Sequence, residues 1–132
     1  MIESSHLNKE KLIEILGNSY SPYSNFAVSS MIVTQKGECF YGCNVENSTF
    51  GATVCAERSA ISNLITSLGP NEKIIEVHVL SKKNEPITPC GICRQSLFEF
   101  STKDTRVFCH SHDFKATEVF LLDELLPRGF RL

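Results

Sequence analysis

Hydrophobic and polar positions repeat with two different periods along the chain, and the changes of period mark the elements that we expect. Apolar residues at helical spacing predict helices over segments 7–16, 53–68 and 88–101, and a helical turn over 122–127. Gly69 and Pro70 form the stop pair that is expected at the end of the second helix. Thr88 is a candidate cap for the third helix, because Pro89 then falls in its first turn.

Strand-like runs separate these helical segments, and they predict strands over 26–34, 38–45, 73–81, 105–110 and 115–121. The first two runs are joined at Gln35, Lys36 and Gly37, so we expect them to form an antiparallel hairpin. The alternation of strands and helices is typical of an α/β fold. We therefore predict a three-layer α/β/α domain, in which helices flank a mixed five-stranded sheet.

Composition adds bounds on size, partners and location. The chain has 132 residues, of which 42% are hydrophobic, so residues 1–132 are expected to form a single domain around one core. The formal net charge is −2, with 13 basic and 15 acidic residues and no basic stripe, which disfavours nucleic acid as a partner. No apolar run approaches the roughly 20 residues that span a bilayer, and none resembles a signal peptide, so we expect a cytoplasmic protein without membrane contact.

Six cysteines in a chain without a secretion signal are expected to be reduced thiols or metal ligands. Cys39, Cys43 and Cys109 fall in the strand-like runs, where we expect buried small hydrophobic residues. The other three are placed differently, at the starts of two predicted helices.

Cys55 is expected in the first turn of the second helix, and Cys90 and Cys93 in the first turn of the third. The positive end of a helix dipole and its free N–H groups favour a thiolate, and three thiolates suit zinc. Three protein ligands leave a position for water, which is the catalytic arrangement. A fourth ligand from His110 or His112 would instead close a structural site.

Glu57 follows Cys55 by two residues, close enough to reach the water position without binding the metal. Such a carboxylate can take a proton from the water and deliver it to a substrate nitrogen, as hydrolytic deamination requires. The alternative is that Glu57 merely stabilises the helix dipole as an acidic residue in the first turn.

The motif "CAER" (55–58) followed by "PCGICRQ" (89–95) resembles the signature of the zinc-dependent cytidine and deoxycytidine deaminases of the small, homotetrameric, three-cysteine type. The resemblance extends to "YSPYSNFAV" (20–28), "GCNVENSTFG" (42–51) and "ELLPRGF" (124–130), and so covers nearly the whole chain. It implies the cytidine deaminase-like fold. It also implies hydrolytic deamination of cytidine and 2′-deoxycytidine to uridine and 2′-deoxyuridine, with release of ammonia, in pyrimidine salvage.

The resemblance assigns roles around the metal. It implies that Cys55, Cys90 and Cys93 hold Zn²⁺, that Glu57 is the catalytic acid and base, and that Arg58 hydrogen-bonds the thiolates. A guanidinium there would offset the negative charge that three thiolates bring to the zinc. Arg94 and Gln95, next to the third ligand, are expected to serve packing and hydrogen bonding only.

The resemblance also implies contacts with a nucleoside substrate. Asn44 and Glu46 would bind the ribose 3′-hydroxyl, and the backbone of Ala56 would contact the base edge. Aromatic residues would supply the remaining contacts. Phe26 would stack against the nucleoside, and Phe50 stands where the family commonly has a tyrosine near the ribose 5′ side. Phe130 would cap the base from an adjacent subunit of a homotetramer.

Three alternatives stay open at this point. A blasticidin-type deaminase shares the zinc motifs, but the "NVEN" loop at 44–47 argues against it. A deaminase that edits RNA or DNA would need a basic groove, which the charge pattern does not offer. A non-catalytic, zinc-stabilised binding module would need the fourth ligand from His110 or His112.

Overall fold

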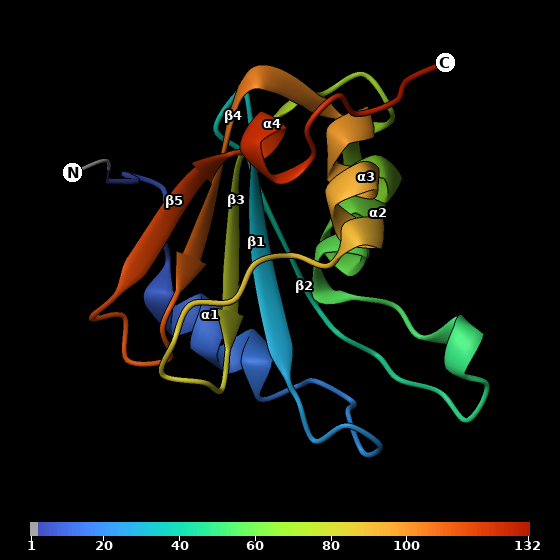
Figure 1. Ribbon diagram of the computed structural model, residues 1–132, viewed down its shortest axis with the longest axis vertical. Coiled ribbons are helices and arrows are strands. Elements are labelled where there is room, and N and C mark those ends of the chain that lie inside the picture. Colours follow the sequence, from blue (N-terminus) through green and yellow to red (C-terminus); the bar gives the residue numbers. More distant parts are fainter. Residues whose placement is uncertain (1–2) are drawn as a thin grey trace.

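A computed structural model describes residues 3–132 and shows a five-stranded sheet in the order β2-β1-β3-β4-β5 (Figure 1). β3 and β4 are parallel and the other neighbours are antiparallel, which confirms the predicted mixed sheet. The elements are α1 (Lys9–Leu16), β1 (Val28–Thr34), β2 (Cys39–Cys43), the short 3₁₀ helix η1 (Phe50–Ala52), α2 (Ala56–Leu68), β3 (Ile74–Ser81), α3 (Gly91–Glu99), β4 (Ser101–His110), β5 (Thr117–Leu121) and α4 (Leu122–Leu125).

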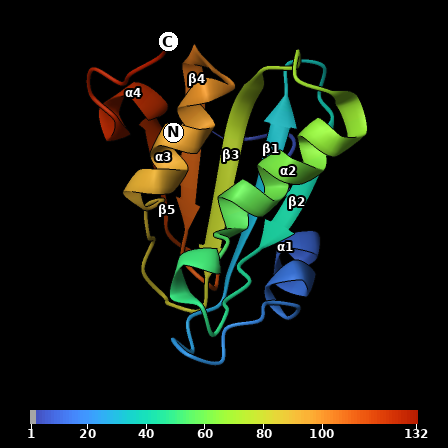
Figure 2. The ribbon, with the colours of Figure 1, turned by 90° about the vertical axis from the view of Figure 1, so that its right-hand side faces the viewer.

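Helices cover both faces of the sheet, as predicted. α2 and α3 lie side by side on one face and α1 lies on the other (Figures 1 and 2). Alternate side chains of β1 face opposite layers: Ile32 packs in the core under α2 and α3, whereas Met31 and Val33 pack with Leu12 of α1. Within residues 3–132, no helix combines the length and apolar character needed to span a bilayer.

Both helices at the metal motifs begin later than the sequence predicts. Cys55 is the N-cap of α2 and Cys90 is the N-cap of α3, so neither lies in a first turn. The prediction that Thr88 caps the third helix was wrong. Thr88 and Pro89 precede the helix, and Cys90 takes the N-cap position with extended backbone but without a side-chain cap hydrogen bond.

The strand β4 is longer than the predicted segment 105–110, because it begins at Ser101, with only Phe100 between it and the end of α3. A register shift in its pairing with β3 separates the pair Ile74 and Ser101 from the regular ladder that starts at Arg106. Thr105 stabilises this irregular stretch by donating its hydroxyl to the carbonyl of Ile74 at 2.6 Å.

The strand β2 lies at the edge of the sheet, and this corrects two predictions of burial. Cys39 and Cys43 are only half-buried, whereas Cys109, in the central part of the sheet, is fully buried as expected. All six cysteines are free thiols.

Gly42 of β2 lets the N-terminal part of α2 approach the sheet closely. A Cβ atom at this position would lie 2.5 Å from the carbonyl oxygen of Ala56 and 2.5 Å from the amide nitrogen of Ala60. Those are backbone atoms that cannot rotate away, so only glycine permits this spacing. Gly42 therefore helps to set the position of the helix that starts at Cys55.

Candidate metal centre and active site

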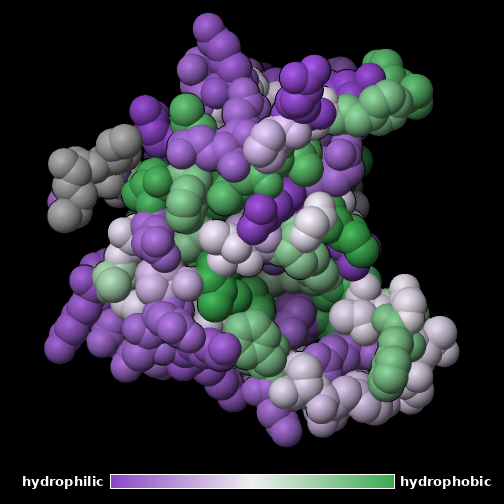
Figure 3. Space-filling model, viewed as in Figure 1, coloured by the Kyte–Doolittle hydropathy of each residue, from purple (hydrophilic) through white to green (hydrophobic). Residues whose placement is uncertain are grey.

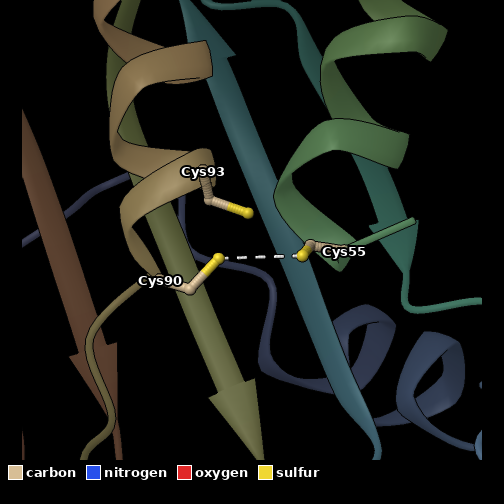
Figure 4. Close-up of side chains that lie close together, drawn as sticks. All are labelled: Cys55, Cys90 and Cys93. Carbon is tan, nitrogen blue, oxygen red and sulfur yellow. Dashed lines mark hydrogen bonds between the residues drawn. The ribbon is translucent and has the colours of Figure 1, made fainter. Parts of the chain in front are cut away.

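The thiols of Cys55, Cys90 and Cys93 converge between the starts of α2 and α3 (Figure 4). Their sulfur atoms all lie within 4.8 Å of one another, and the Sγ atoms of Cys55 and Cys90 are 3.8 Å apart. Cys93 is buried, Cys55 is half-buried and Cys90 is exposed. The structure therefore brings together the three residues that the sequence predicts as ligands.

The surroundings of the thiols differ in their effect on ionisation. Burial opposes the thiolate of Cys90, but the backbone N–H of Cys93 and the neighbouring thiols hold the pKa of Cys90 below its ordinary value. Burial, followed by the nearby charge of Glu57, raises the pKa of Cys93. Because all three thiols must lose their protons to bind a metal as thiolates, metal binding at this site is coupled to proton release.

Glu57 lies in the first turn of α2, and its side chain is directed inward rather than into solvent. Only 4% of the residue is exposed, and the side chain lines the same cavity as the three cysteines. Burial raises the pKa of this carboxyl above its ordinary value. A buried carboxyl with a raised pKa beside a metal-binding cluster is an arrangement for proton transfer.

Arg58 follows Glu57 and directs its guanidinium to the start of the helix. Its Nη2 donates to the carbonyl oxygen of Thr53 at 2.9 Å and to the sulfur of Cys55 at 3.7 Å. Within the described residues, its buried Nε–H has no hydrogen-bond partner. A cation held against a ligand sulfur can offset the charge of a three-thiolate centre.

The cysteines and Glu57 line a cavity of about 330 Å³. Figure 3 shows a hollow in the molecular surface, with hydrophobic side chains around it, beside the lobe that contains η1. Of the residues predicted to contact a substrate, Phe26, Asn44, Glu46 and Ala56 line the cavity. The cavity has further lining residues that were not predicted from the sequence: Ser24, Val28, Thr53, Ile87 and Thr88.

Asn44 and Glu46 follow the end of β2 and are held by the loop before β1. The Asn44 amide oxygen accepts from the amide of Val28 at 2.9 Å, and its nitrogen donates to the carbonyl of Phe26 at 2.8 Å. The Glu46 carboxylate accepts from the amides of Tyr23 and Ser24 and from the Ser24 hydroxyl, and these bonds lower its pKa despite some burial. The loop thus fixes an amide and an ionised carboxylate side by side in the cavity wall.

The sequence profile described as "Cytidine and deoxycytidylate deaminase zinc-binding region" matches residues 3–110. The chain belongs to the cytidine and deoxycytidylate deaminase family. The cytidine deaminases of Mycoplasma pneumoniae and Mycoplasma genitalium are 41% and 44% identical to it, over 92% of this chain and over 90% and 92% of the relatives. The crystal structure of cytidine deaminase from Burkholderia pseudomallei superposes with a TM-score of 0.83 at 35% identity, over 97% of this chain and 100% of that one.

Zinc, the metal of this deaminase family, fits the three cysteines. Thiolate donors select zinc over harder divalent metals. A zinc–sulfur distance of about 2.3 Å in tetrahedral geometry separates two sulfurs by about 3.8 Å, which is the spacing of Cys55 and Cys90. The protein is therefore a zinc-binding deaminase of the three-cysteine type.

The histidines that could have closed the zinc site lie elsewhere. His110 is on the face of the sheet opposite the cysteines, because it alternates along β4 with Cys109, which packs under α2 and α3. His110 contacts His78 and Thr117, and His112 contacts the carbonyl of Ser81. Among the described residues, the cluster of potential metal ligands contains the three cysteines and no histidine.

Two predicted substrate contacts lie outside the cavity of the single chain. Phe50 is 75% exposed on η1 and packs edge-on against Tyr23, with ring centroids 5.9 Å apart. Phe130 is 66% exposed in the C-terminal segment, and its carbonyl accepts a hydrogen bond from Gln95. Their assignment to the active site therefore stays a prediction that requires a second copy of the chain.

Proposed function

We propose that this protein hydrolytically deaminates cytidine and 2′-deoxycytidine to uridine and 2′-deoxyuridine, releasing ammonia. The observation that carries the proposal is the buried carboxyl of Glu57 beside the three converging thiols, in one cavity. Relatives named cytidine deaminase match this chain over nearly its whole length.

We assign the zinc ligands to Cys55, Cys90 and Cys93. Zinc bound there lowers the pKa of a bound water towards about 7 and so supplies a nucleophile at neutral pH. Arg58 supports this chemistry, because its contact with the Cys55 sulfur withdraws part of the negative charge that the thiolates place on the metal.

Glu57 moves the protons in this proposal. Its carboxylate takes a proton from the attacking water and delivers it to N3 of the pyrimidine as the oxygen adds to C4. It then transfers the remaining proton of the added oxygen to the amino nitrogen, which leaves as ammonia when the C4–N bond breaks. Burial favours this role, because it excludes bulk water from the carboxyl.

The cavity wall provides the nucleoside contacts in the same proposal. Asn44 and Glu46 bind the ribose 3′-hydroxyl, because the amide has a donor to spare and the ionised carboxylate an acceptor. Phe26 stacks on the nucleoside and the backbone of Ala56 meets the base edge. A cavity of about 330 Å³ suits a small molecule rather than a nucleic acid strand.

We further propose a homotetramer, in which a neighbouring subunit brings Phe130 to the base and Phe50 to the ribose. The exposure of both rings supports an assembly that covers them. We assign the reaction to pyrimidine salvage and the protein to the cytoplasm, where its six free thiols stay reduced.

The test is the change in ultraviolet absorbance when the zinc-loaded protein is mixed with cytidine or 2′-deoxycytidine. Turnover with release of one ammonia per nucleoside is the expected result. A folded protein with one zinc per chain that converts neither nucleoside would overturn the proposed substrate and would favour a non-catalytic zinc module.

A further inference from the structure

The segment that enters the metal centre ahead of Cys90 packs Ile87 against the core, but it receives its hydrogen bonds from one side chain. Among residues 3–132, every hydrogen bond that reaches segment 84–89 comes from Arg94. The Nε–H of Arg94 donates to the carbonyl oxygen of Pro89 at 2.7 Å, and its Nη2 donates to Thr88 Oγ1 at 2.8 Å. Both acceptors belong to the two residues that immediately precede a zinc ligand.

The third nitrogen of the same guanidinium connects this segment to the hydrophobic core. Nη1 of Arg94 donates to the carbonyl oxygen of Leu125 at 2.8 Å. Leu125 is the last residue of α4, and its side chain is part of the core cluster under α2 and α3. α4 lies beside α3 in both ribbon views (Figures 1 and 2). Arg94 therefore fixes the entry to α3 relative to a buried element.

The residues that Arg94 holds are stiff, so the hydrogen bonds control direction as well as distance. Proline fixes its own φ near −65° and restricts the residue before it to extended backbone. Thr88 and Pro89 thus form a short rigid arm that leads into Cys90. The planar guanidinium donates to this arm from two nitrogens at set angles and holds it in one orientation, which a lysine cannot do.

We propose that Arg94 is a positioning residue of the zinc centre, which presets Cys90 relative to Cys93 and slows the release of the metal. Groups behind the ligands commonly change metal affinity 10- to 100-fold when they are removed. The inference depends on the zinc assignment and not on the proposed substrate, because retention of zinc can be measured without any nucleoside.

Arg131 offers a matched control. It also donates from its guanidinium to backbone carbonyls beside α3, but at the opposite end of the helix, where it binds Phe98 at 2.7 Å and Ser101 at 3.3 Å. Loss of either arginine leaves carbonyl groups without their donor and weakens the packing around α3. Only Arg94 is connected to the residues that carry Cys90.

The experiment measures the rate at which full-length, zinc-loaded protein releases zinc to an excess of a chromogenic chelator. We expect Arg94→Ala to release zinc 10- to 100-fold faster than the unsubstituted protein, Arg94→Lys to fall between them, and Arg131→Ala to stay within about twofold. Thermal unfolding of the zinc-free variants reports how much stability each substitution removes on its own.

If Arg94→Ala releases zinc at the same rate as the unsubstituted protein, the proposal is wrong. Equal acceleration by Arg94→Ala and Arg131→Ala would also overturn it, because general loosening of α3 would then suffice. If Arg94→Ala does not fold, the zinc-release rate of Thr88→Val is measured instead. This substitution removes the hydroxyl that accepts a hydrogen bond from Arg94 and preserves the shape of the side chain. Faster zinc release from Thr88→Val is expected, and an unchanged rate would contradict the role of this arm.

Discussion

The sulfur atoms of Cys55 and Cys90 lie 3.8 Å apart, although 35 positions separate them in the sequence. Each residue is the N-cap of a different helix, and the two helices lie next to each other on one face of the sheet. A metal that binds both sulfurs therefore connects α2 to α3, and its binding free energy contributes to folding.

Zinc should stabilise the protein through this connection. Above the dissociation constant, each tenfold rise in free zinc is expected to add about 1.4 kcal/mol to the free energy of unfolding. Cys90→Ala should abolish that dependence, whereas Cys39→Ala, at a half-buried cysteine outside the cluster, should retain it. Urea unfolding at buffered zinc concentrations measures both. If the free energy of unfolding rises equally with zinc concentration in Cys90→Ala and in the unsubstituted protein, zinc does not connect α2 to α3.

Glu57→Gln tests the proton-transfer role separately from metal binding. The amide has nearly the same shape but cannot carry a proton between water and substrate, so we expect turnover to fall by about 10²- to 10⁴-fold. Zinc content should stay at one per chain, since the side chain is not among the clustered ligands. Steady-state kinetics and zinc analysis on the same sample measure the turnover and the zinc content. An active Glu57→Gln protein would refute the acid and base assignment.

The metal centre was predictable from local sequence, because helix starts impose a known geometry. The positions of Cys55, Cys90 and Cys93 at two helix starts predicted that their thiols could meet, and the structure brings the three sulfur atoms together. The boundaries were less predictable. Thr88 has the chemistry of a cap, but the N-cap is Cys90, two residues later, and the Thr88 hydroxyl accepts a hydrogen bond from Arg94, a contact that helical periodicity does not reveal.

Relationships across the sheet were not predictable from the chain alone, because they depend on strand order and register. Cys39 and Cys43 have the pattern of buried strand residues, but residue spacing does not show that their strand lies at the edge of the sheet. His110 was a candidate zinc ligand, yet pairing beside β3 brings His110 against His78 on the opposite face. Such contacts follow from tertiary structure rather than from residue spacing.

Gly42→Ala should disturb the metal centre from a distance. The added methyl group would meet backbone atoms of Ala56 and Ala60 at 2.5 Å, so α2 must shift, at an expected cost of about 1–3 kcal/mol. Gly51→Ala is the control, because nothing lies within 4 Å of the corresponding Cβ position. We expect lower stability and weaker zinc binding for the first variant only. Equal urea midpoints for the two variants would contradict the close approach.

Phe130→Ala tests the proposed contribution of a neighbouring subunit. The ring is 66% exposed in the single chain, so its removal should change the stability of the isolated fold by no more than about 0.5 kcal/mol. If the ring covers the base in a tetramer, kcat/KM should nevertheless fall at least tenfold. Kinetics together with light scattering on the same sample measure both effects. Unchanged kcat/KM in an intact oligomer would remove Phe130 from the active site.

A chain of polar side chains on the α1 face, with the buried residues His78 and His110 at its centre, should make the protein acid-sensitive. Glu76, His78, His110 and Thr117 are connected by contacts of 2.9 to 3.0 Å. With both histidines neutral, each contact has one donor and one acceptor. His78 donates its Nε2–H to Glu76, and His110 donates its Nε2–H to Nδ1 of His78. The Thr117 hydroxyl donates to Nδ1 of His110. Burial is the main cause that lowers the pKa of His110 to about 4.

The sign of the effect follows from proton uptake. The unfolded chain protonates His110 near pH 6.5 and the folded chain only near 4, so stability is complete above pH 6.5 and declines as the pH falls towards 4. The full loss is about 3 kcal/mol. Urea unfolding between pH 7 and 4 should show this decline, and His110→Asn should reduce it, whereas His112→Asn, at an exposed histidine, should not. An NMR titration that places the pKa of His110 near 6.5 would refute the assignment, because the folded and unfolded states would then bind this proton equally.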